Sequence, residues 1–289
     1  MVLAQLGFGG MNVFSRLGGR DLPFSEVAAA RFLVGALVAI GLARLRGTSL
    51  RVTDGRNTWL RSLFGTGSAI GHFYAISSQR IPLGDAATLS ATAPVWVALL
   101  SRRLLGERVG KSVTAAVGLA FIGIVAVVRP TFGAAADVAL IATTGAFFYA
   151  LAMIWLRKIG PGESSEAIVL HFSSVACVTM LLISIPVWVT PDAAGALWLL
   201  GTGLCGGLAQ IAMTRAYTLD RAARVSTVSF LGIVVTHALA VPIFGEVPTL
   251  LQLGGASLVI VAGAMLAQGA RRETRAVGRS ETVDQVRAG

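Results

Sequence analysis

Long apolar runs separated by short basic segments are the feature that most constrains this chain. The run 165–189, for example, contains a single charged residue, Glu166. A helix needs about 20 mostly apolar residues to cross the hydrocarbon core of a bilayer. Charged residues make up only 13% of the sequence, whereas soluble domains contain about 25%. The chain is therefore predicted to be an all-α integral membrane protein.

Runs bounded by Arg, Gly, Pro and Asp predict ten transmembrane helices. Their approximate bounds are 2–17, 24–45, 58–78, 84–104, 112–129, 136–156, 165–189, 194–216, 223–244 and 249–269. The fifth run ends at Arg129-Pro130, because proline cannot continue a helix interior and disfavours helix in the residue before it. We therefore predict two five-helix halves, residues 1–130 and 136–270, and a disordered cytoplasmic tail, residues 271–289.

The basic residues predict how the chain is oriented. If the N-terminus is cytoplasmic, the cytoplasmic loops and tail collect most of them: Arg44, Arg46, Arg51, Arg56, Arg61, Arg102, Arg103, Arg108, Lys111, Arg157, Lys158, Arg215, Arg221, Arg224, Arg271, Arg272, Arg275, Arg279 and Arg287. The opposite side receives Arg16, Arg20, Arg80 and Arg129. Since cytoplasmic loops are enriched in Lys and Arg, both termini are predicted to be cytoplasmic. The net charge of +10 is thereby assigned to topology, and no nucleic acid partner is expected.

The two halves share a sequence pattern. Residues 104–109 (Leu-Leu-Gly-Glu-Arg-Val) resemble residues 243–248 (Ile-Phe-Gly-Glu-Val-Pro), and Thr88 and Ser90 match Thr227 and Ser229 at the same spacing. Basic residues surround the first Gly-Glu and are missing around the second. Five helices per half would place the halves in opposite orientations, so the second copy would face outward. Inverted repeats of this kind are typical of secondary transporters.

Several short motifs carry a resemblance to a known family. They are Glu-Val-Ala-Ala-Ala-Arg-Phe at 26–32, Phe-Tyr-Ala at 73–75, Ile-Pro-Leu-Gly-Asp-Ala at 81–86, Ala-Pro at 93–94, Leu-Gly-Glu-Arg at 105–108, Arg-Ala-Tyr at 215–217 and Phe-Gly-Glu at 244–246. Together they resemble the EamA-type proteins of the drug/metabolite transporter superfamily over about residues 1–270. The aromatic-Gly-x-Asn opening of that family is only partly present, at residues 8–12.

The resemblance implies ten transmembrane helices in two inverted five-helix repeats, in the cytoplasmic (inner) membrane. It also implies transport of small metabolites, often export of amino acids or related compounds. Some subgroups of the family instead take up cofactor-like solutes such as S-adenosylmethionine or riboflavin.

Polar side chains inside the predicted helices are the candidate site residues. A charged group at the centre of a membrane helix costs about 2.5–3.5 kcal/mol on insertion scales, so it needs a partner or a function. The candidates for a substrate pathway are Asn12, Arg31, His72, Tyr74, Thr88, Thr92, Trp96, Gln210, Thr214, Tyr217, Ser229 and His237, and the candidate for proton coupling is Asp85.

Several of these candidates also have a structural interpretation. Arg31 either faces a central cavity and attracts a substrate carboxylate or phosphate, or extends to the interface and pairs with Glu26. Asp85 either couples protons or caps a helix N-terminus. The histidines are either substrate contacts or buried side chains with a satisfied partner. Small hydroxyl side chains also let helices approach closely.

Trp96 and three further side chains are assigned mainly to structure. Trp96 and Tyr149 either wall a ligand or pack against lipid. Glu107 and Glu246 are expected to cap helix ends or to pair with arginines.

Other classes of membrane protein have less support. The sequence has no HExxH motif, no DxxD pair and no GxxxxGK[ST] loop, which argues against a metalloenzyme and against ATP-driven transport. Its two cysteines lie inside apolar runs, so neither a disulfide nor a metal site is expected. No filter-like loop or charged ring indicates a channel. A membrane enzyme and a structural scaffold remain distant alternatives.

We therefore expect a secondary transporter that works by alternating access and requires no cofactor or metal. Its site is predicted near the bilayer midplane, between the third, fourth, eighth and ninth helices. Its expected partners are a small-molecule solute and membrane lipid, and the sequence leaves a homodimer open.

Overall fold

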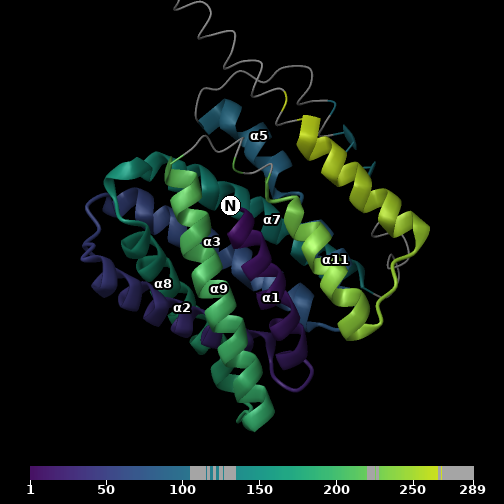
Figure 1. The fold of residues 1–289 in the computed structure, drawn as a ribbon, viewed down its shortest axis with the longest axis horizontal. Helices are drawn as coiled ribbons and strands as arrows, with labels where there is room; N and C mark the ends of the chain where they lie inside the picture. The colour runs from purple at the N-terminus through teal and green to yellow at the C-terminus, as the bar shows by residue number, and fades with distance from the viewer. Residues whose placement is uncertain are drawn as a thin grey trace, which may run out of the picture.

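The computed structural model describes residues 1–104, 135–219 and 228–265, with isolated positions between and beyond these ranges. Within this part of the chain the regular structure is helical, without strands, which confirms the predicted class (Figure 1). The helices include α1 (Val2–Gly18), α2 (Phe24–Arg46), α3 (Gly55–Ser77), α4 (Leu83–Ser90), α5 (Ala93–Leu104), α7 (Ala136–Ile159), α8 (Ser165–Ser184), α9 (Ala193–Leu219) and α11 (Leu231–Phe244). A further apolar helix spans Leu250–Met265.

Four helices are long and apolar enough to cross a membrane: α2, α7, α8 with its short extension to Val187, and α9. The chain is thus a membrane protein with several spans, but the predicted number of ten is not confirmed. The predicted span 84–104 is interrupted by a turn at Ala91-Thr92, which separates α4 from α5. Most of the predicted span 112–129, Glu107 and the tail 271–289 lie outside the described residues.

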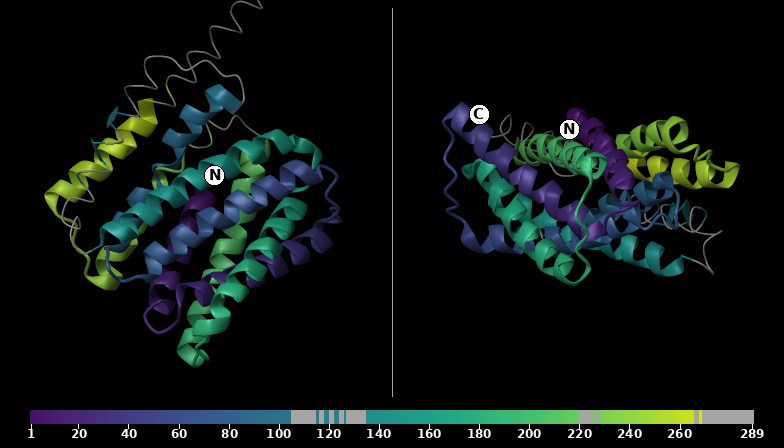
Figure 2. Two further views of the ribbon diagram at one scale, coloured as in Figure 1. Left: turned by 180° about the vertical axis from the view of Figure 1, so that it is seen from behind. Right: turned by 90° about the horizontal axis from the view of Figure 1, so that it is seen from below.

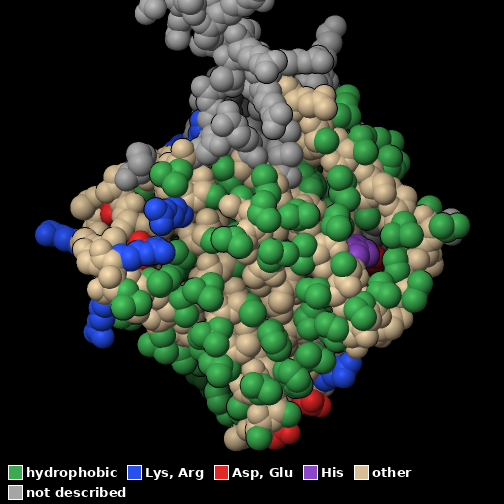
Figure 3. Space-filling view, in the orientation of Figure 1, with side chains coloured by type: hydrophobic (Ala, Val, Ile, Leu, Met, Phe, Trp, Pro, Cys, Tyr) green, Lys and Arg blue, Asp and Glu red, His purple; other side chains and the backbone are tan. Residues whose placement is uncertain are grey.

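Large apolar side chains cover the outer surface of the long helices. Leu37 on α2, Leu182 on α8 and Leu140 on α7 are 59%, 62% and 69% exposed. Figure 3 shows one such face, on which apolar side chains are spread widely and charged side chains lie toward the edges. Soluble proteins rarely expose a contiguous apolar patch above a few hundred Å², so this surface is suited to contact with lipid.

Helix contacts cross between the two halves of the chain. Helix α3 packs against α7 and α1 against α9, while α2 contacts both α8 and α9, and α3 also contacts α8 (Figures 1 and 2). In the two predicted halves, α1, α2 and α3 correspond to α7, α8 and α9. Exchanging the halves therefore turns the α3–α7 contact into the α9–α1 contact, and the α2–α9 contact into the α8–α3 contact. This correspondence is expected of a duplicated unit related by a pseudo-two-fold axis. The inverted orientation of the repeats in the membrane stays a prediction.

The α3–α7 contact depends on two glycines. A Cβ atom added to Gly71 would lie 2.7 Å from the carbonyl oxygen of Ile141 and 3.0 Å from Cα of Gly145. The two helix backbones therefore touch directly at this point. Small residues at membrane helix contacts allow such close approach and the van der Waals packing that replaces the hydrophobic effect in lipid.

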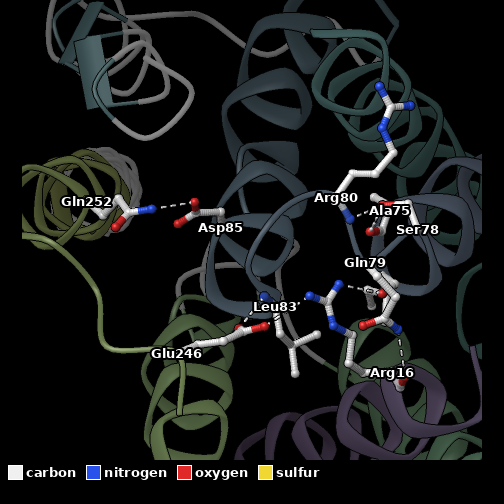
Figure 4. A network of polar contacts seen from close by, with 10 residues as sticks. Arg16, Ala75, Ser78, Gln79, Arg80, Leu83, Asp85, Glu246 and Gln252 are labelled. Carbon is white, nitrogen blue, oxygen red and sulfur yellow. Dashed lines mark hydrogen bonds and ion pairs between the residues drawn. The ribbon is translucent and has the colours of Figure 1, made fainter. Parts of the chain in front are cut away.

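A buried polar network joins four helices at one end of the bundle (Figure 4). Arg16 of α1 donates from Nη2 to Glu246 Oε1 at 3.0 Å and from Nη1 to the carbonyl oxygen of Ile76 at 3.0 Å. The other oxygen of Glu246 accepts the backbone N–H of Leu83, the first residue of α4, at 2.6 Å. Gln79 Nε2 donates to the carbonyl oxygen of Arg16 at 2.9 Å. We refer to these five residues as the Arg16 network.

The Arg16 network bears on two expectations from the sequence. Glu246 was expected to cap a helix or pair with an arginine, and it does both. Arg16, which the sequence assigns to the side opposite the cytoplasm, lies in the last turn of α1 and is only 5% exposed. Its side of the membrane stays a prediction.

The glycine contact predicts opposite outcomes for two matched substitutions. Gly71→Ala should lower the free energy of unfolding by about 1–3 kcal/mol, the usual cost of overpacking. Gly41→Ala on α2, where an added Cβ meets nothing within 4 Å, should be neutral or stabilising because alanine favours helix. Reversible unfolding in mixed micelles measures both. Equal effects of the two substitutions would contradict the direct backbone contact.

Loss of the buried ion pair Arg16–Glu246 should lower the free energy of unfolding more than loss of an exposed ion pair. Glu246→Ala leaves the Arg16 guanidinium buried without a counterion and should cost on the order of 3 kcal/mol of unfolding free energy. Asp137→Asn, which removes an ion pair with Arg80 whose side chains are 44% and 50% exposed, should cost clearly less. The same unfolding assay compares them, and a larger loss for Asp137→Asn would refute the assignment of Arg16–Glu246 as the structural pair.

Candidate functional site

A cavity of about 180 Å³ lies between the two halves of the chain. Helices α1, α2, α3, α4 and α5 contribute residues to it from the first half, and α7, α8, α9 and α11 from the second. The sequence predicted a site between the third, fourth, eighth and ninth spans. The corresponding helices, α3 for the third span, α4 and α5 for the fourth, α9 for the eighth and α11 for the ninth, all reach the cavity, together with α1, α2, α7 and α8.

One side of the cavity carries a chain of neutral polar groups. Asn12 Nδ2 donates to Thr236 Oγ1 at 3.3 Å, and Asn12 Oδ1 lies 3.2 Å from Nε2 of His72. Nδ1 of the same imidazole lies 3.1 Å from Ser90 Oγ. Since an amide oxygen only accepts, Nε2 of His72 is the donor to Asn12. These hydrogen bonds therefore link α1, α3, α4 and α11 across both halves of the polypeptide.

The cavity also contains two buried guanidinium groups. Arg31 of α2 is 3% exposed and donates from Nη2 to the carbonyl oxygen of Gly206 at 3.3 Å and to Gln210 Oε1 at 3.0 Å. Arg61 of α3 is 1% exposed and lies over the ring of Phe172, with Cζ 3.9 Å from the ring centroid. Both side chains line the cavity.

These positions bear on two expectations from the sequence. Arg31 does not pair with Glu26, whose Oε1 instead accepts the backbone N–H of Val189 at 2.6 Å. Arg61 is counted with the cytoplasmic basic residues in the sequence, near the start of the predicted span 58–78. Since α3 begins at Gly55, Arg61 lies more than a turn inside the helix, and its side of the membrane stays a prediction.

Two helix interruptions meet at the cavity. The first is the turn at Ala91-Thr92 between α4 and α5, and the second is the turn at Ser229-Phe230 before α11. Ala91 and Ser229 both line the cavity. They occupy nearly corresponding positions in the two halves. Discontinuous helices in corresponding positions of two repeats often mark the binding site of a secondary transporter.

The candidate residues from the sequence fall into two groups. Those that line the cavity are Asn12, Arg31, His72, Gln210 and Ser229, and Tyr149, which had been assigned mainly to packing, joins them. Those that do not line it are Tyr74, Asp85, Thr88, Thr92, Trp96, Thr214, Tyr217 and His237.

Most members of the second group have partners elsewhere. Thr88 and Thr92 donate to carbonyl oxygens of their own helix segment, those of Gly84 and Leu89. His237 Nδ1 donates to the carbonyl oxygen of Ile233 at 3.0 Å, one turn back on α11. These contacts satisfy the polar groups locally.

The aromatic and remaining polar candidates also have neighbours outside the cavity. Tyr74 and Trp96 pack edge-on against Phe24 and Phe147, with ring centroids 5.5 Å apart in each pair. Tyr217 is buried in an apolar cluster. The hydroxyl of Thr214 is buried without a hydrogen-bond partner among the described residues.

Asp85 lies in the first turn of α4 but makes no capping hydrogen bond. Its Oδ2 accepts from Gln252 Nε2 at 2.6 Å, which ties α4 to the helix Leu250–Met265 (Figure 4). No metal-binding group of His, Cys, Asp and Glu occurs within the described part of the chain.

The chain is similar to known transporters over most of its length. A pseudopaline exporter of Pseudomonas aeruginosa is 28% identical over 264 residues, which cover 90% of this chain and 92% of that protein. A riboflavin transporter of Vibrio cholerae is 23% identical over 280 residues, covering 95% and 94% of the two chains. Solute carrier family 35 member G1 of Mus musculus is 26% identical, covering 82% and 68%.

A solved crystal structure shares the fold, with a TM-score of 0.70, 20% identity and coverage of 93% and 98%. The EamA-like transporter family matches residues 1–129 and 138–268. This chain belongs to the EamA-like transporter family, as its sequence motifs predicted.

Proposed function

We propose that the chain is a secondary transporter that exports a small metabolite, such as an amino acid or a related compound, across the cytoplasmic membrane by alternating access. The observation that carries the proposal is a cavity lined by both halves of an apolar helix bundle, with polar and charged groups facing it. Such groups are costly in a membrane protein and mark solute and ion pathways.

The position of the Arg16 network supports alternating access. The lining on α1 runs from Gln5 to Asn12, and Arg16 lies one turn beyond. The network therefore closes that end of the cavity by joining α1 and α3 to α4 and to Glu246 after α11. In the proposed cycle the contacts of Glu246 with Arg16 and Leu83 break when this end opens. With both termini in the cytoplasm, this is the outer end.

Two observations bear on solute and direction. The cavity of about 180 Å³ is smaller than the roughly 300–1,000 Å³ of sites for drug-sized ligands, which favours a solute of amino acid size. The similarity to a pseudopaline exporter favours export. The similarity to riboflavin transporters favours the second candidate, uptake of a cofactor-like solute.

Metabolite profiling of cells with and without the full chain tests the function and its direction. Export predicts a metabolite enriched in the medium and depleted inside the cells that carry the protein. The opposite distribution would select the uptake candidate. The absence of any difference, with protein present in the membrane, would overturn the assignment as a transporter of small metabolites.

A matched pair of substitutions on α7 tests the route. Ala146 lines the cavity and is 3% exposed, whereas Thr144 on the same helix is exposed on the outer surface. Ala146→Phe should fill the cavity and reduce transport at least tenfold, while Thr144→Phe should leave it unchanged. Protein abundance and melting temperature are measured for both. Full transport by a correctly folded Ala146→Phe variant would show that the solute takes another path.

A further inference from the structure

The two guanidinium groups of the cavity have no counterion among the described residues. Ion pairs in this part of the chain include Arg16–Glu246, Arg46–Glu166 and Arg80–Asp137, and none includes Arg31 or Arg61. Both arginines are nonetheless almost completely buried. A buried charge is normally paired or neutralised by a ligand, so these two positive charges need an explanation that the fold itself does not supply.

Their hydrogen bonds are also incomplete. Nη1 of Arg31 and both Nε and Nη1 of Arg61 are buried and have no acceptor among the described residues. The neighbouring rings attract a cation, but they do not provide the oxygen acceptors for which a guanidinium is suited. Carboxylate and phosphate oxygens match the planar fork of arginine N–H groups. The partners that these N–H groups lack are therefore hydrogen-bond acceptors that carry a negative charge.

Both guanidinium groups lie around one aromatic ring. Cζ of Arg61 is 3.9 Å and Cζ of Arg31 is 6.0 Å from the centroid of Phe172. Arg31 also lies 4.3 Å from the centroid of Phe32. Two like charges held this close repel each other, and a single ligand with two negative groups would neutralise both at once.

The packing around Arg61 keeps this arrangement in place. A Cβ atom added to Gly65 would lie 2.5 Å from Arg61 Nη1 and 2.7 Å from Cε2 of Phe172. Glycine at this position leaves the room in which the guanidinium stacks on the ring. The neutral chain around His72 provides no comparable charge, so the positive character of the cavity is confined to the part near Phe172.

We propose that the cavity selects solutes with two anionic oxygen groups, carboxylate or phosphate, and that Arg31 and Arg61 each bind one of them. The carbon skeleton of such a solute lies against the rings of Phe172 and Phe32. Neutral analogues lose both charge contacts, and cations are repelled. This proposal rests on the proposed function, because it assigns the solute class of the same cavity.

Binding of small probes to the purified full chain in detergent tests whether the cavity selects solutes with two anionic groups. The two anionic probes, called dianions here for their two anionic groups, are succinate with two carboxylates and 3-phosphoglycerate with a carboxylate and a phosphate. Succinamide is the neutral match and butane-1,4-diamine the dication, all at constant ionic strength. Ligand-dependent melting temperatures give an apparent Kd for each. At least one dianion should bind at least tenfold more tightly than succinamide, and the diamine should not bind. The tighter of the two dianions shows whether a phosphate is preferred to the second carboxylate.

Substitutions locate the effect. Arg31→Gln and Arg61→Gln should each reduce the preference for the dianion over succinamide at least tenfold, and the Lys variants should retain part of it. Arg44→Gln on α2 and Arg56→Gln on α3, both exposed arginines on the same helices, should leave it unchanged. If a Gln variant does not fold, the comparison of dianion with succinamide on the native chain still decides.

Two results would overturn the proposal: succinamide or the diamine binding as tightly as both dianions, or a dianion preference that persists in both Gln variants. Metabolite profiling separates this failure from failure of the proposed function. Transport of a neutral or cationic metabolite would support the assignment as a transporter and contradict the proposed selection of solutes with two anionic groups. No transport of any metabolite would remove the function itself.

Discussion

The bilayer core contains no water to satisfy polar groups, and the rest of the structure depends on this constraint. Backbone N–H and C=O groups must be paired within each segment, so the regular structure of the described residues is helical. Polar side chains must also find partners inside the bundle. Two groups of contacts meet this requirement. One is the row of hydrogen bonds from Thr236 through Asn12 and His72 to Ser90, and the other is the Arg16 network. Each joins one half of the chain to the other.

The buried arginines differ in how their charge is balanced, and this difference separates structure from function. Arg16 has a carboxylate partner in Glu246 and a carbonyl acceptor in Ile76, so its charge is compensated by the fold. All three side chains have at least one buried N–H without an acceptor among the described residues, so the difference lies in the carboxylate. Arg31 and Arg61 have no carboxylate partner among these residues. The first arrangement closes an end of the cavity. The second leaves a site whose missing component is a ligand.

Some of the cavity residues can be predicted from the sequence, and others cannot. A polar residue within an apolar run is conspicuous, and Asn12, Arg31, His72 and Gln210 indeed face the cavity. Hydroxyl groups are ambiguous because they can bond to their own helix, as Thr88 does. Their direction depends on local backbone geometry that composition does not reveal.

Depth and long-range pairing are the quantities that the sequence does not contain. Arg61 lies near the start of the predicted span 58–78, and the sequence alone does not show that its side chain is buried against Phe172. The partnership of Arg16 with Glu246 joins opposite ends of the chain, and neither residue identifies the other. The turn at Ala91-Thr92 comes just before Pro94, which has no backbone N–H to donate to the carbonyl oxygen of Ser90. The proline therefore marks a break that the predicted single span 84–104 missed.

The central claim is that the cavity between the two halves is a solute path open alternately to each side of the membrane. Ser68 lines this cavity and is 9% exposed, so a thiol placed there reports access directly. The measurement uses Ser68→Cys in a chain whose Cys177 and Cys205 are replaced by serine, reconstituted in vesicles and treated with a membrane-impermeant thiol reagent from either side. The account predicts modification from both sides. Modification from neither side, or from one side only, would contradict it.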